Sequence, residues 1–111
     1  MKNKYKHTEA AENWTDENIN VFVLNDTTYN VDGVVWKLIS RDEVEPDDKY
    51  GMVSYKFRNE VEDIEYRAGK LNCEEYYTCW SGDTNRSSLA RKGRHEIAAL
   101  FACVKIYKLT Y

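Results

Sequence analysis

The side chains best suited to chemistry in this sequence are two histidines and three cysteines, His7, His95, Cys73, Cys79 and Cys103. The spacing of Cys73 and Cys79 is wider than that of the paired cysteines of structural zinc sites. Cys103 lies in an apolar segment, where a free cysteine usually acts as a small hydrophobic side chain. We therefore predict no metal site and no bound cofactor.

Nucleophilic catalysis requires a serine or cysteine beside a base. His7 lies in a polar N-terminal segment, and His95 stands between Arg94 and Glu96, as in a solvated first turn of a helix. The sequence contains no G-x-S-x-G motif. We predict no catalytic residues and a protein that is not an enzyme.

The distribution of charge along the chain is uneven. Residues 84–111 contain six basic residues and one acid, Glu96, a net charge of +5, whereas the whole chain carries −3 and residues 1–83 therefore −8. Three of the basic residues, Arg86, Arg91 and Arg94, are candidate binding residues. They predict either a bound anion or nucleic acid, or ion pairs with the acidic part of the same chain. A ribonuclease-like site could also recruit His95 and Tyr107.

Acidic residues gather in two stretches, 42–48 and 60–65. Rows of carboxylates can imitate the phosphates of DNA and occupy a basic nucleic-acid channel. Four of these residues are therefore candidate binding residues: Asp47, Asp48, Glu62 and Glu65.

The segment 74–80 (EEYYTCW) has the aromatic content of a strand. Strict alternation would place Tyr76 and Trp80 on one face and Tyr77 on the other, so both faces would be aromatic. Tyr and Trp are enriched at interfaces. We include Tyr76, Tyr77 and Trp80 among the candidate binding residues.

Four segments have the apolar or alternating pattern of strands, at 19–24, 34–39, 50–58 and 74–80. Asp32-Gly33 predicts a tight hairpin turn before the second of them. The pattern at 60–66 leaves a strand and a short helix equally open. The acidic stretch 42–48 and the polar stretch 81–93 are expected to be loops, with a ragged helix start as the alternative for the latter.

The segment 94–104 is expected to be the main helix because Ile97, Ala98, Leu100, Phe101 and Val104 form a broad apolar face. The alternation in 105–111 predicts a closing strand. The expected fold class is α+β: a small antiparallel sheet of four to six strands with one main C-terminal helix packed on it. Residues 1–18 are expected to be a mobile polar N-terminal segment, and residues 19–111 a single α+β domain.

The sequence has no apolar run of the roughly 20 residues that a membrane-spanning helix needs, and no signal-peptide core is recognisable near its start. Three cysteines are an odd number, which argues against a disulfide framework. We expect a cytoplasmic protein with three free thiols that does not engage a membrane.

These features together predict a small, acidic, non-enzymatic binding protein that inhibits or modulates a larger macromolecular machine. The expected partner is a protein, in particular a nucleic-acid-handling complex. The composition resembles AT-rich coding sequence, so one concrete form is a phage or mobile-element inhibitor of host defence of the anti-CRISPR kind. The alternatives are a nucleic-acid-binding or ribonuclease-like protein that uses 86–95, with direct contact to nucleic acid, and a virion or other assembly component, which would form homo-oligomers.

Overall fold

The computed structural model describes residues 12–91 and 93–110 of the 111-residue chain. Eight strands form one antiparallel sheet in which each strand pairs with the next in the sequence. The strands are β1 (Asn13–Asp16), β2 (Ile19–Asn25), β3 (Thr28–Val31), β4 (Val34–Val44), β5 (Met52–Asn59), β6 (Tyr66–Leu71), β7 (Tyr76–Ser81) and β8 (Thr84–Leu89). One helix, α1 (His95–Thr110), follows them.

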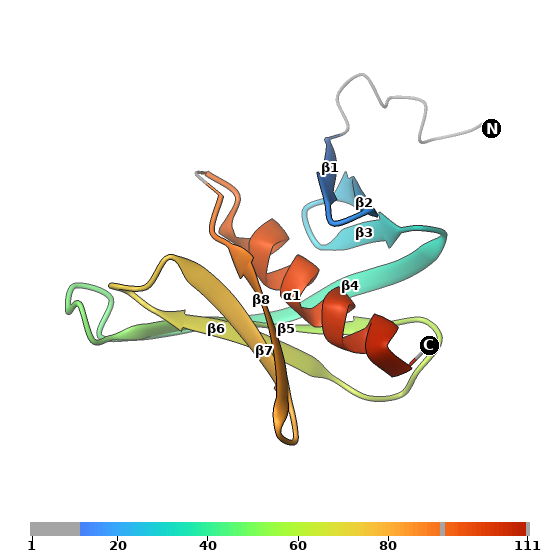
Figure 1. Ribbon diagram of the computed structural model, residues 1–111. Helices are drawn as coiled ribbons and strands as arrows, with labels where there is room; N and C mark the ends of the chain where they lie inside the picture. Colours follow the sequence, from blue (N-terminus) through green and yellow to red (C-terminus); the bar gives the residue numbers. More distant parts are fainter. Residues whose placement is uncertain (1–11, 92, 111) are drawn as a thin grey trace.

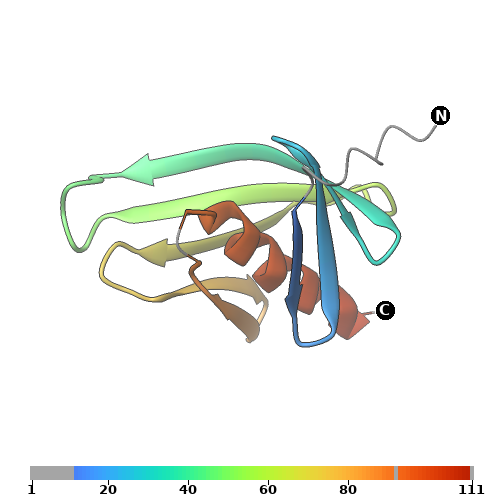
Figure 2. The same ribbon diagram turned by 90° about the horizontal axis from the view of Figure 1, so that it is seen from above.

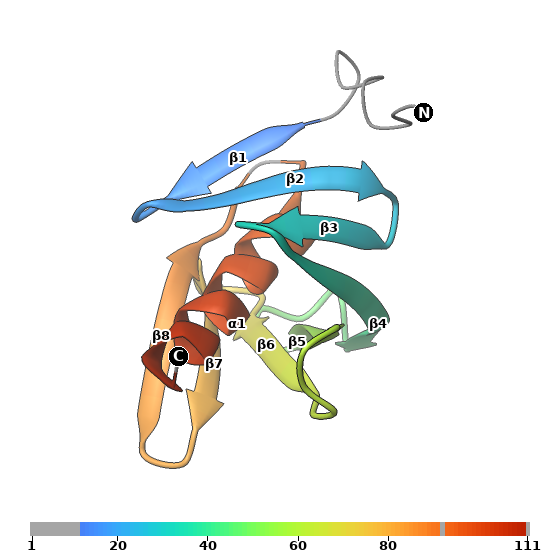
Figure 3. The ribbon, with the colours of Figure 1, turned by 90° about the vertical axis from the view of Figure 1, so that its right-hand side faces the viewer.

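The sheet is curled into a half-barrel, and α1 lies inside the curl (Figure 1). Viewed from the side, β1 to β3 pass over one flank of the helix and β7 and β8 lie along the other (Figure 3). A twisted sheet of this many strands tends to curl, because the rotation between neighbouring strands accumulates across the sheet. The concave, inner face of the sheet therefore faces α1, and the convex, outer face points away from it.

The prediction of four to six strands is wrong, because the sheet has eight. Two of the additional strands are its edges. β8 lies in the stretch 81–93 that was expected to be a loop, and β1 lies within residues 1–18, expected to be mobile. Residues 1–11 of that segment are outside the described part of the chain. Both edge strands are short and polar, so neither has the apolar pattern by which the other strands were recognised.

The hairpin turn at Asp32-Gly33 is confirmed. Both residues have positive φ, 50° and 94°, and they connect the paired residues Val31 and Val34. Two successive left-handed residues match the twist of the adjoining strands, and glycine adopts this conformation without steric cost. This turn fixes the register of β3 and β4.

The helix is buried on all sides over its central turns. Every residue from Ile97 to Val104 is at most 1% exposed. The predicted burial of Leu100 and Phe101 is confirmed, since both are fully buried. Large side chains of the inner face complete the core, with Trp36 of β4 packed edge-on against Tyr107 of α1 at 5.5 Å between ring centroids.

The closing strand predicted at 105–111 is wrong, because α1 continues to Thr110. Ile106 and Tyr107 continue the buried surface of the helix, and the aliphatic stem of Lys105 is buried with them. Alternating apolar residues over so few positions also fit a helical stripe, which explains the wrong prediction. The stretch 60–66 is likewise a loop as far as Glu65, and β6 begins at Tyr66.

Candidate functional site

The acidic candidate residues do not form one surface. Asp47 and Asp48 lie in the loop between β4 and β5, whereas Glu62 and Glu65 lie in the loop between β5 and β6. The two loops are at opposite ends of β5, which spans about 26 Å at about 3.3 Å per residue for its eight residues. A partner that contacts one pair need not reach the other.

Glu62 and Glu65 are engaged within the chain. Glu65 contacts Lys56 at 3.3 Å and Arg58 at 2.9 Å, and these cations lower the pKa of its carboxyl group. Glu62 accepts a hydrogen bond of 2.5 Å from the hydroxyl of Tyr66 and one of 3.3 Å from Asn59. These two carboxylates hold the β5–β6 loop in place, which is sufficient to explain their presence.

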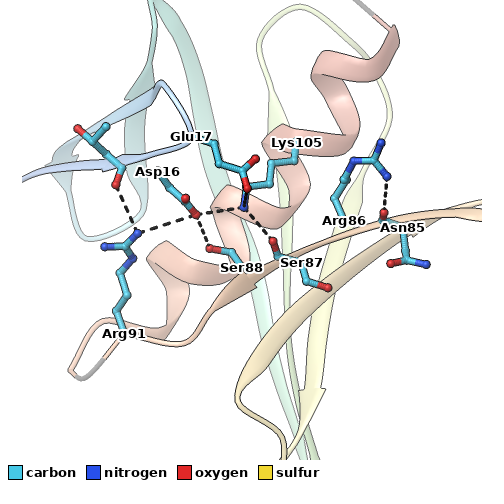
Figure 4. Close-up of polar contacts among 9 residues, drawn as sticks. Asp16, Glu17, Asn85, Arg86, Ser87, Ser88, Arg91 and Lys105 are labelled. Carbon is cyan, nitrogen blue, oxygen red and sulfur yellow. Dashed lines mark hydrogen bonds and ion pairs between the residues drawn. The ribbon is translucent and has the colours of Figure 1, made fainter.

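The basic candidate residues Arg91 and Arg94 both contact acidic residues of the N-terminal part. Arg91 lies at the seam between the edge strands β1 and β8 (Figure 4). Arg91 is sandwiched between the rings of Trp14 and Phe101, at 5.4 and 5.2 Å from their centroids. Arg94 pairs with Glu12 and, at 2.7 Å, with Glu96. The third candidate, Arg86, is exposed on β8, and its guanidinium donates to the carbonyl of Asn85.

Asp16 of β1 is the centre of this seam (Figure 4). Its Oδ2 lies 3.1 Å from Nζ of Lys105, accepts a hydrogen bond of 2.9 Å from the hydroxyl of Ser88, and lies 3.9 Å from Arg91. Only 7% of the Lys105 side chain is exposed. Side chains thus connect the two edge strands where the sheet itself does not close.

Ion pairs within the chain account for part of the uneven charge. Four of the six basic residues in 84–111 form ion pairs with carboxylates of the chain: Arg91, Arg94, Lys105 and Lys108. Their partners include Glu12, Asp16 and Asp32 of the acidic N-terminal part. These pairs attach the helix and the segment before it to the strands that cover the helix.

The three aromatic candidates divide between the two faces of β7. Tyr77 is fully buried in the core, so its assignment as a surface binding residue is wrong. Tyr76 and Trp80 lie on the outer face, 51% and 63% exposed. Alternation along β7 was predicted correctly, and it identifies the outer face as the one that a partner could reach.

An apolar row crosses the outer face over five adjacent strands. Its members lie at the end of the sheet that carries the β4–β5 and β6–β7 loops, and they are Val44, Met52, Leu71, Tyr76 and Leu89. Pairing places Val44 beside Met52, Met52 beside Leu71, and Tyr76 beside Leu89. All except Leu71 are about half exposed, from 46% to 58%. Exposed apolar residues that gather at one end of a sheet face in this way are typical of interaction sites.

Small side chains form the next row along the strands, Ser54, Gly69, Thr78 and Ser87. A Cβ at Gly69 would lie 3.1 Å from Cβ of Ser54, closer than ordinary van der Waals contact, so this position favours glycine. The hydroxyls of Thr78 and Ser87 are hydrogen-bonded at 2.9 Å. Because these side chains are small, the middle of the outer face is recessed relative to the apolar row.

The result is an outer hollow of about 830 Å³, defined by Met52, Ser54, Arg67, Gly69, Leu71, Thr78, Trp80 and Asn85 with further residues around them. β6 and β7 pair only at Ala68–Cys79 and Gly69–Thr78, and Ile106 of the helix forms part of the hollow beyond this contact. The volume lies within the range of ligand and peptide sites. The sequence did not reveal the hollow, because recognising it requires the register of β8.

Acidic loops border the end of the outer hollow that carries the apolar row. The acidic residues of these loops are Glu45, Asp47, Asp48, Glu74 and Glu75. None of their carboxylates has an ion-pair partner among residues 12–91 and 93–110. Asp48 accepts a hydrogen bond from the amide of Tyr50, and Glu74 accepts one from the amide of Leu71. These bonds shape the loops and leave the negative charges uncompensated.

The three cysteines are free thiols in different surroundings. Cys73 is exposed, whereas Cys79 and Cys103 are buried beside each other. Burial raises the pKa of the Cys103 thiol, and a hydrogen bond with Cys103 lowers that of Cys79. In the described part of the chain, no three His, Cys, Asp or Glu side chains gather in a set suited to a metal ion.

We predict that iodoacetamide modifies only Cys73 in the native protein and all three cysteines after unfolding, because alkylation requires an accessible thiolate. Mass spectrometry of the protein labelled without reductant measures both states. Two protected sites in the unfolded, unreduced protein would instead indicate a Cys79–Cys103 disulfide and contradict the assignment of free thiols.

α1, the one helix in the described residues, is too short and too polar at its ends to cross a membrane. Comparison with known proteins adds no relative. No protein-family model, curated protein or solved structure matches this chain.

Proposed function

We propose that this chain is a small binding protein that attaches to a larger protein through the outer hollow. The observation that carries the proposal is the apolar row beside five uncompensated carboxylates. Half-exposed Tyr, Met and Leu side chains supply contact area with little polar surface to desolvate. In protein interfaces such residues form the centre, and charged residues form the rim.

The charge at this end of the hollow favours a basic partner. Asp47, Asp48, Glu74 and Glu75 would face lysine or arginine side chains, which increases the association rate and disfavours acidic partners. Proteins that handle nucleic acids present such basic surfaces. The proposed activity is therefore to modulate or inhibit a nucleic-acid-handling protein by covering part of its basic surface, and an inhibitor of host defence carried by a phage is one such protein.

Direct binding of nucleic acid is less well supported. Affinity for nucleic acid comes largely from cations that are free to neutralise phosphates. Arg91 and Arg94 are already paired with Asp16, Glu12 and Glu96. The segment 86–95 consequently offers fewer free cations than its sequence suggests.

We predict that a photo-crosslinking residue at Tyr76 captures a basic protein in cells of the native host, whereas the same residue at Phe22 does not. Phe22 is a matched control because it is a 41% exposed aromatic residue on β2, away from the outer hollow. Mass spectrometry identifies the captured chain. A crosslink to a second copy of this chain would instead indicate a homo-oligomer and contradict the proposal.

With the captured partner purified, Tyr76→Ala should weaken binding at least about 30-fold, the effect of a 2 kcal/mol hot spot. Asp47→Lys with Asp48→Lys should also weaken it, and more strongly at low salt. Phe22→Ala should leave the Kd unchanged. Equal effects of Tyr76→Ala and Phe22→Ala on the Kd would contradict a protein-binding site on the outer face. Salt-sensitive binding of RNA that Arg86→Ala removes would also contradict it.

A further inference from the structure

A second pocket, of about 430 Å³, lies on the inner face of the sheet at the start of α1. The loop between β4 and β5 extends past the beginning of the helix (Figure 2). The pocket is lined among others by Arg41, Tyr55, Lys70, Tyr77, His95 and Glu96. Lys70 also lines the outer hollow, so the two cavities adjoin at this residue, but the proposed function does not use the inner pocket.

Two hydrogen bonds and a ring contact fix the aromatic wall of the inner pocket. Nε of Arg41 donates to the hydroxyl of Tyr55 at 3.1 Å, and the hydroxyl of Tyr77 lies 2.9 Å from Nδ1 of His95. The rings of Tyr55 and Tyr77 pack edge to face, with 5.7 Å between their centroids. Burial raises the pKa of Tyr77, so its hydroxyl keeps its proton. When Tyr77 donates to Nδ1, Nε2 of His95 carries the ring proton and can donate to a ligand. His95 is half-buried and lies in the first turn of α1, where the sequence predicted it.

Lys70 supplies a positive charge without a counter-charge. The residue is only 7% exposed, and its Nζ donates to the backbone carbonyls of Leu71 at 3.1 Å and Asn72 at 3.4 Å. Within the described residues it has no carboxylate at ion-pair distance. Buried charges are normally paired, since the loss of hydration is otherwise not offset. A bound anion would provide the missing negative charge.

The two acidic residues of the pocket lie in ion pairs with cations other than Lys70. Glu43 pairs with Arg41 at 3.0 Å, and this contact lowers the pKa of its carboxyl group. Glu96 pairs with Arg94 at 2.7 Å, a cation that it shares with Glu12. The three cations and three carboxylates therefore balance in number, and the positive charge is local to Lys70. The start of α1 adds the positive end of the helix dipole on the same side.

We propose that the inner pocket binds the phosphate group of a small organic phosphate. Lys70 and Nε2 of His95 hold the phosphate, and Tyr55, which is less deeply buried than Tyr77, packs against the organic part. An ammonium and an imidazole N–H are suited to phosphate as charge and donor. The volume of about 430 Å³ admits a phosphate with a single ring attached.

Titration of ¹⁵N-labelled protein with inorganic phosphate and with phenyl phosphate, at constant ionic strength, tests the proposal by NMR. We expect saturable shifts at Lys70, Tyr55 and His95, with phenyl phosphate binding more tightly because it also contacts the ring of Tyr55. Lys70→Met should weaken binding at least tenfold. Lys37→Met removes an exposed lysine from the outside of β4 and should change nothing.

Glu43→Gln provides a second measurement in case Lys70→Met does not fold. Glu43 is exposed, and its loss removes a nearby negative charge and frees Arg41, so phosphate should bind severalfold more tightly. Three results would overturn the proposal: no saturable shift with either compound in the folded protein, equal affinities for Lys70→Met and Lys37→Met, or weaker binding by Glu43→Gln.

Discussion

Phe101→Ala is expected to lower the free energy of unfolding by about 3–5 kcal/mol, the usual cost of truncating a fully buried aromatic residue. Phe101 is completely buried in the middle of α1, and its ring also contacts the guanidinium of Arg91. The loss equals a large part of the total stability of a domain of this size. At about 4 °C or more per kcal/mol, the melting temperature should fall by at least roughly 12 °C.

Leu109→Ala is the matched control, because Leu109 lies on the same helix and is 52% exposed. Its expected effect is within about 0.5 kcal/mol. Urea denaturation followed by circular dichroism measures both variants. If the two midpoints are equally close to that of the unmodified protein, the helix does not lie inside the sheet as described.

Asp16→Ala should cost about 3–5 kcal/mol, because it removes one partner of a buried ion pair and leaves the other without compensation. Lys105, with 7% of its side chain exposed, would retain only Glu17 at 3.6 Å as an anionic neighbour. The hydroxyl of Ser88 would also lose its acceptor. Thermal and urea unfolding both measure the effect.

Glu17→Ala separates this explanation from a general effect of charge. Glu17 contacts the same lysine, but its side chain is 71% exposed, so its loss should cost at most about 1 kcal/mol. The double variant Asp16→Ala/Lys105→Met should recover part of the stability, since no charge then remains buried. Equal costs for Asp16→Ala and Glu17→Ala would show that the seam does not depend on the buried pair.

Local patterns in the sequence were sufficient to predict part of this fold. The apolar positions of 94–104 identified the helix, Asp32-Gly33 identified a hairpin, and alternation identified β5. In each case the residues that decide the local conformation are neighbours in the chain. Such signals do not depend on the tertiary structure.

β8 could not be predicted in the same way. Of its six residues only Ser88 is buried, so the strand has no apolar face. Its backbone pairs with β7, and its position beside the helix is fixed by contacts of Lys105 with Ser87 and Asp16. These contacts join residues far apart in the sequence, and composition does not reveal them.

The candidate site illustrates the same difference. The sequence identified Tyr76 and Trp80 as exposed aromatic residues but also included Tyr77, because alternation alone does not tell which face of a strand is buried. It identified the charges of Glu65, Arg91 and Arg94 but not their partners. Met52 and Leu89 joined the apolar row only once the pairing of their strands was known.

The position of α1 after all eight strands has a consequence for synthesis on the ribosome. Chains grow at about 5–20 residues per second, so residues 12–89 are made about 1–4 seconds before the last turn of α1. Each hairpin can pair as it emerges, because every strand contacts its predecessor. The inner faces of these hairpins nevertheless remain exposed to water until the helix arrives. The nascent sheet is therefore the state of this protein most exposed to aggregation and to chaperone binding.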